Sequence, residues 1–67
     1  MKGVGEMPFI QIYMVEGRTI QQKREMSKVI TEEVARIAKV KEDRVKIYFI
    51  DMKPENVVTG GKLKIDE

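Results

Sequence analysis

The sequence predicts an α+β fold, in which a β-α-β unit with parallel strands is followed by a short C-terminal β-hairpin. Two stretches of alternating side chains, residues 9–15 and 44–52, flank a segment whose apolar residues recur at helical spacing. A Gly-Gly pair near the C-terminus separates two short candidate strands of the hairpin. With 67 residues, of which 42% are hydrophobic, the chain is expected to form one globular domain.

The first strand is expected over residues 9–15. Its side chains point alternately to two faces, one with Phe9, Gln11, Tyr13 and Val15 and the other with Ile10, Ile12 and Met14. Both faces are largely apolar, which indicates that both are covered in the folded protein. The strand ends at Glu16-Gly17-Arg18, which is expected to form a turn.

A helix is expected to begin after Thr19. Thr19 and Gln22 have the spacing of a capping box, in which each side chain accepts a hydrogen bond from the other residue's backbone N–H. The helix should extend over roughly 19 residues, with one apolar stripe formed by Met26, Val29, Ile30, Val34, Ile37 and Ala38. A helix of this length between two strands favours a right-handed β-α-β unit.

The second strand is expected over residues 44–52, and a hairpin is expected after it. Alternation places Val45, Ile47 and Phe49 on one face of this strand and Lys46, Tyr48 and Ile50 on the other. Lys53-Pro54-Glu55-Asn56 interrupts the pattern, and Val57-Val58 is a candidate third strand. Gly60-Gly61 is expected to form the tight turn that precedes residues 62–65.

The composition restricts the chemistry of any site. The chain has no Cys and no His, which excludes disulfides, thiol catalysis, zinc sites built on Cys or His, and triads that need an imidazole. No metal site is therefore expected. The available groups are Pro, Arg, Lys, Tyr and carboxylates.

The hydropathy and charge patterns favour a cytoplasmic protein. The apolar runs are far shorter than the ~20 residues that span a membrane, so no membrane partner is expected, and the first residues lack the apolar stretch of a signal peptide. The net charge is +2, but Lys and Arg alternate with Glu and Asp along the chain. This interleaving disfavours a nucleic-acid partner, which usually requires a concentrated basic surface.

The predicted elements are too few to form a stable monomer. One helix covers one face of a two-stranded sheet, which leaves the other apolar face and both strand edges exposed to water. Burial against further copies of the chain is the expected solution. We therefore predict a homo-oligomer in which subunits extend the sheet and close over its uncovered face.

The chain resembles the 4-oxalocrotonate tautomerase family from Pro8 to about Leu63. The resemblance rests on the joint spacing of Pro8 and the strand after it, Glu16-Gly17-Arg18, the Gln22-Lys23 pair, the strand end at Met52, and Gly60-Gly61. It implies the tautomerase fold, assembled as a hexamer that is a trimer of dimers. It also implies a cofactor-free isomerase whose amino-terminal proline moves protons between oxygen and carbon of an enol or 2-oxo acid, such as 2-hydroxymuconate.

The resemblance also implies the residues of the site. Pro8 would be the catalytic base, and Arg18 would bind a substrate carboxylate. The family's second arginine corresponds to Lys46, whose ammonium keeps the charge but not the planar fork of a guanidinium. Arg44, two residues earlier on the same face, could take over that role. The family's pocket aromatic corresponds to Val57, which leaves the identity of the substrate open.

The start of the mature chain decides between two functions. We expect residues 1–7 to be a leader or upstream start and residues 8–67 to be a single tautomerase-like domain. Initiation at Met7 and removal of that methionine would give Pro8 a free secondary amine. If the leader is retained, the Pro8 nitrogen is an amide without basicity, and the alternative is a non-catalytic oligomer with the same fold.

Overall fold

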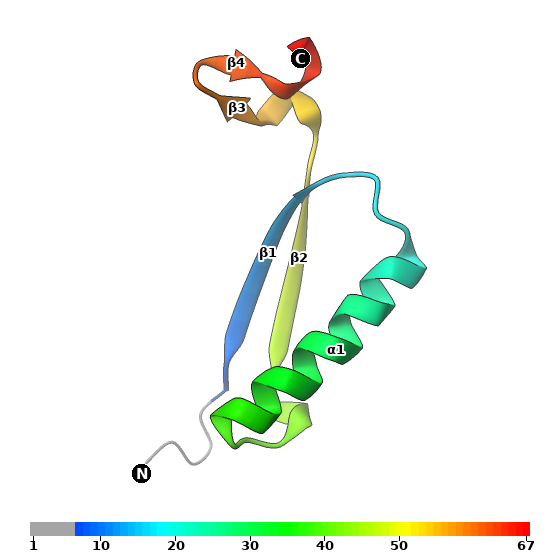
Figure 1. Ribbon diagram of the computed structural model, residues 1–67, viewed down its shortest axis with the longest axis vertical. Helices are drawn as coiled ribbons and strands as arrows, with labels where there is room; N and C mark the ends of the chain where they lie inside the picture. Colours follow the sequence, from blue (N-terminus) through cyan, green and yellow to red (C-terminus); the bar gives the residue numbers. More distant parts are fainter. Residues whose placement is uncertain (1–6) are drawn as a thin grey trace.

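The computed structural model describes residues 7–67, so the predicted leader lies outside the described residues except for Met7. The chain forms β1 (Phe9–Val15), α1 (Ile20–Ala38), β2 (Lys46–Met52), β3 (Val58–Thr59) and β4 (Lys62–Leu63) in that order (Figure 1). Short 3-10 turns occur at Glu42–Arg44, Pro54–Asn56 and Lys64–Asp66. The predicted β-α-β unit with a C-terminal hairpin is confirmed.

Strands β1 and β2 pair in parallel, as predicted. Their register places Phe9 opposite Lys46 and Val15 opposite Met52. Helix α1 lies over the face that contains Ile12, Phe49 and their neighbours, since an ion pair joins α1 to Asp51 of that same face. Side chains on this face are partly buried, apart from Asp51, whereas Phe9 and Tyr13 on the opposite face are 66% and 64% exposed.

Helix α1 has the predicted start. Gln22 N–H donates to Thr19 Oγ1 at 3.0 Å, and Thr19 N–H donates to Gln22 Oε1 at 2.9 Å, which completes the capping box. At the other end, Lys39 adopts a left-handed conformation with φ 61°, and its N–H donates to the carbonyl of Ala35. The helix therefore has a defined first and last turn.

Three predicted boundaries differ from the structure. Strand β2 begins at Lys46 and not at residue 44, because residues 42–44 form a 3-10 turn in which Val45 N–H donates to the carbonyl of Glu42. The third strand is Val58–Thr59 instead of residues 57–58. The last strand ends at Leu63, because residues 64–66 form another 3-10 turn.

The hairpin turn depends on its two glycines. Gly60 and Gly61 have φ angles of 60° and 83°, and both lie between the antiparallel strands β3 and β4. Two consecutive positive φ angles are typical of the type I′ turn, whose twist matches that of a hairpin. The hairpin lies beyond the end of β2, away from α1 (Figure 1).

The described chain has almost no interior of its own. Within residues 7–67, only Ala35 is buried, with 7% of its surface still exposed, and large apolar side chains are exposed on both the sheet and the helix. The chain is also flat and elongated, with extents of 48 × 26 × 14 Å. No helix among residues 7–67 combines the length and the apolar character that crossing a membrane requires.

Candidate active site

Pro8 lies immediately before β1, at the end of the sheet where β2 also begins. Its carbonyl oxygen accepts a hydrogen bond from the backbone N–H of Lys46 at 3.0 Å. A proline tolerates this position because its missing N–H is not required by the strand pairing. The structure therefore brings Pro8 and Lys46 together, with the Lys46 side chain exposed.

An aromatic pair lies beside Pro8 and Lys46. The rings of Phe9 and Tyr48 stack with their centroids 6.5 Å apart and their planes at 11°. Both belong to the uncovered face of the sheet, together with Lys46. They supply an apolar surface on the same face as the Lys46 cation, at the end of the sheet where the chain enters β1 from Pro8. Sequence reasoning did not find this pair, because it depends on the register between two strands that are far apart in the sequence.

Arg44 does not lie on the same strand face as Lys46. It belongs to the 3-10 turn at Glu42–Arg44, where its N–H donates to the carbonyl of Lys41 at 2.9 Å. Residues two apart share a face only where the backbone is extended. The same-face argument for Arg44 as a replacement for the second arginine is therefore wrong, and Lys46 is the cation that the structure places next to Pro8 through the backbone pairing.

Arg18 lies in the turn between β1 and α1 and is exposed. A shallow cavity of about 470 Å³ adjoins it and is lined by Arg18, Gln22, Glu25, Met26, Val29 and Ile30. The guanidinium thus lies where the polar start of α1 meets its apolar stripe. Such a position suits the binding of an anionic group of a partly apolar molecule.

Val57 lies at the start of the C-terminal arm. Its carbonyl oxygen accepts a hydrogen bond from Lys64 N–H at 2.8 Å, which holds the arm together. Val57 also lines a groove of about 350 Å³ together with Tyr13, Met14, Val15, Met52, Asn56 and Val58. This groove lies where β1 and β2 end, which is the opposite end of the sheet from Pro8.

The candidate residues thus form two groups at opposite ends of the two strands. Pro8 and Lys46 precede β1 and begin β2, whereas Arg18 and Val57 follow these strands. Seven strand residues at about 3.3 Å each separate the two groups by about 20 Å. A small substrate cannot contact both groups of one chain.

The sequence is similar to known tautomerases over nearly its whole length. The family model for tautomerase enzymes matches residues 8–67. A probable tautomerase of Streptococcus agalactiae serotype III (strain NEM316) is 38% identical over 58 residues, which cover 87% of this chain and 97% of the relative. The likeness in sequence therefore extends over nearly all of the described residues.

Solved structures show the same architecture. One from work on the 4-oxalocrotonate tautomerase isozymes of Methylibium petroleiphilum is 36% identical, with a TM-score of 0.84 and coverage of 88% of this chain and 92% of that chain. A chain of the heterohexamer 4-oxalocrotonate tautomerase from Chloroflexus aurantiacus J-10-fl is 25% identical, with a TM-score of 0.83 and coverage of 90% and 97%.

Proposed function

Because this chain belongs to the tautomerase enzyme family, whose model matches residues 8–67, we propose that a chain beginning at Pro8 ketonises enolised 2-oxo acids. The predicted resemblance to 4-oxalocrotonate tautomerases is confirmed by relatives and solved structures. The observation that carries the proposal is the backbone hydrogen bond between Pro8 and Lys46, at the end of the sheet where the Phe9–Tyr48 stack lies on the Lys46 face.

The proposed reaction needs a proline amine that is neutral near pH 7. Apolar surroundings and a nearby cation both disfavour the protonated amine, and so lower its pKa. The Phe9–Tyr48 stack and Lys46 are suited to these two roles. The neutral amine of Pro8 would take the proton from the enol hydroxyl, and the resulting ammonium would return a proton to carbon. The proton transfers balance without a redox change, so the proposed reaction requires no cofactor.

We further propose that the site is shared between subunits. Arg18 of a neighbouring chain would bind a substrate carboxylate, Lys46 would add a second positive charge, and Val57 would form part of the pocket wall. The separation of the two groups within one chain supports this arrangement. The heterohexameric relative supports an assembly of six chains, which we expect here to be a homohexamer built from three dimers.

The decisive experiment compares three proteins in the ketonisation of 2-hydroxymuconate and phenylenolpyruvate. These are the chain that begins at Pro8, the same chain with Pro8→Ala, and the full 67-residue chain. We expect activity without added cofactor in the first, and a loss of at least about a hundredfold in the other two because each lacks the secondary amine. Equal rates for the chain that begins at Pro8 and its Pro8→Ala variant would contradict the proposal.

The alternative function follows from the covalent state of Pro8. If Met7 remains attached, the nitrogen is acylated and the protein is a non-catalytic oligomer with the same fold. The intact mass of the protein from its native host distinguishes the two. A mass that includes Met7, together with an inactive full-length chain, would favour the alternative.

A further inference from the structure

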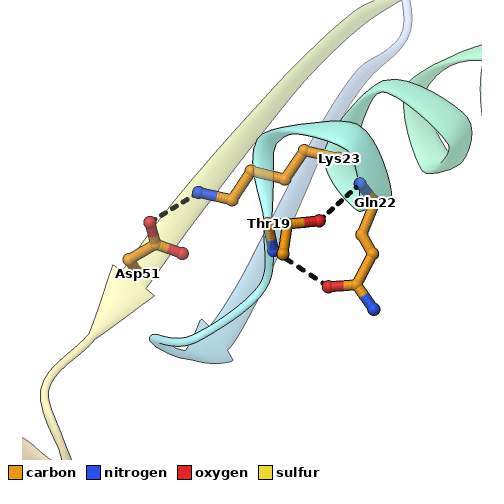
Figure 2. Close-up of polar contacts among 4 residues, drawn as sticks. All are labelled: Thr19, Gln22, Lys23 and Asp51. Atoms are coloured by element: carbon orange, nitrogen blue, oxygen red, sulfur yellow. Dashed lines mark hydrogen bonds and ion pairs between the residues drawn. The ribbon is translucent and has the colours of Figure 1, made fainter.

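The turn that carries Arg18 is connected at both ends to two adjacent residues of β2. On the strand side, Glu16 N–H donates to the carbonyl of Met52 at 2.9 Å. On the helix side, Lys23 Nζ donates to Asp51 Oδ2 at 2.6 Å (Figure 2). Asp51 and Met52 therefore support the whole turn between β1 and α1.

Between these two connections the turn has little support of its own. Gly17 has φ 128°, and apart from Gly17 itself and its neighbours Glu16 and Arg18, no residue of the described chain would lie within 4 Å of a Cβ built there. Arg18 is exposed, and regular secondary structure resumes only at the capping box of Thr19 and Gln22 (Figure 2). The position of the Arg18 backbone therefore depends on where the first turn of α1 is held.

The Lys23–Asp51 pair differs from the other ion pairs of residues 7–67. It joins residues 28 positions apart, whereas the other three join residues three or four apart along the chain. Its side chains are 21% and 40% exposed, so Lys23 is partly desolvated, unlike Lys28, which is 74% exposed in its pair with Glu32. A partly desolvated pair between two elements is screened less than a surface pair.

We propose that Lys23 and Asp51 are positioning residues, whose ion pair holds the start of α1 against β2 and so fixes the Arg18 guanidinium for a substrate carboxylate. The inference rests on the proposed function of Arg18. Bidentate binding of a carboxylate requires a fixed fork, so a mobile turn weakens binding. Pro8 lies at the other end of the strands, so we expect its geometry to be unchanged when the pair is lost.

Steady-state kinetics of the chain that begins at Pro8 test this role. We expect Asp51→Asn and Lys23→Met each to raise KM for 2-hydroxymuconate about tenfold while kcat changes less than about twofold. Lys23→Arg retains the charge and should recover most of the loss. Lys28→Met is the matched control, because it removes an exposed helix ion pair and should leave KM unchanged. An unchanged KM in Asp51→Asn would overturn the inference.

A double-mutant cycle separates positioning from a direct role. In the Arg18→Ala background there is no guanidinium to position, so Asp51→Asn should raise KM no further. A rise as large as in the parent background would show that the pair acts independently of Arg18, and would contradict the inference. Sedimentation of each variant checks that its assembly is intact.

Amide hydrogen exchange tests whether the Lys23–Asp51 pair holds the turn, and it does so without requiring enzymatic activity. We expect Asp51→Asn to accelerate exchange at the hydrogen-bonded amides of Thr19, Gln22 and Lys23 by about tenfold or more, with no change in Lys28→Met, because only the first variant frees the start of α1. Unchanged exchange would overturn the inference. If the parent chain shows no proline-dependent turnover, the proposed function fails, and hydrogen exchange alone still shows whether the pair holds the turn.

Discussion

Lys46 is the position at which the resemblance to 4-oxalocrotonate tautomerases predicts an arginine and this chain has a lysine. Its backbone is fixed against Pro8, so the position is defined even though the side chain is exposed. An ammonium is a point charge, whereas a guanidinium binds a carboxylate through two parallel hydrogen bonds. We expect Lys46→Arg to lower KM for 2-hydroxymuconate severalfold, and Lys46→Met to raise it. Identical KM values in all three proteins would remove Lys46 from the site.

A second prediction at the scale of single residues concerns Arg18, which lies at the other end of the strands. Arg18→Ala should lower kcat/KM for the diacid 2-hydroxymuconate, because a charged hydrogen bond to the substrate is lost. The loss should correspond to about 2 kcal/mol of transition-state stabilisation. Phenylenolpyruvate has one carboxylate and should be affected less. Rate measurements with both substrates check this, and Arg24→Ala, which removes another exposed arginine near the start of α1, is the control. Equal losses in the two variants would argue against a site at Arg18.

Among the elements, helix α1 should owe part of its stability to the capping box in its first turn. Thr19→Ala removes the acceptor for the Gln22 N–H and should lower the free energy of unfolding by about 1 kcal/mol per chain. Denaturant unfolding at one fixed protein concentration measures this. Gln21→Ala, at an exposed position next to the capping box, should have little effect. A loss as large in Gln21→Ala would mean that the capping box is not the cause.

The elements were predictable from the sequence where their signals are local. Strand β1 and the start of α1 follow from alternation over a few residues and from the spacing of Thr19 and Gln22. The start of β2 was placed too early, because alternation does not distinguish an extended Arg44 from one in a 3-10 turn. The Phe9–Tyr48 stack could not be predicted, because it depends on the register of strands that are distant in sequence.

The candidate site was predictable only as a set of residues. Pro8, Arg18, Lys46 and Val57 were named from the family resemblance, but their distribution over two ends of the sheet required the parallel pairing of β1 with β2. The connection from Lys23 to Asp51 spans 28 positions and has no local signal. Contacts between elements, and not the elements themselves, are what the sequence left undetermined.

The whole molecule has an uncovered sheet face that should lie between subunits. Tyr13 is 64% exposed on this face, two residues before Val15 and opposite Ile50. Tyr13→Asp would bury an unpaired charge in the assembly, at a cost of several kcal/mol, and should dissociate or unfold it. Light scattering at micromolar concentration should give a molar mass several times the 7.8 kDa of one chain for the parent protein. The control variant Gln21→Asp, which adds a charge at an exposed position, should give the same mass. A folded parent monomer would refute this prediction.

The scarcity of buried side chains in the described chain has a consequence for how the protein behaves on dilution. A chain in which Ala35 is the only buried residue between positions 7 and 67 should gain most of its burial through association, so that folding and assembly become one equilibrium. The thermal midpoint should then rise with protein concentration, as calorimetry over a hundredfold dilution series would show. The specific activity per chain should fall in the same dilution series, which makes the catalytic capacity of a cell depend more than linearly on how much of the protein it synthesises.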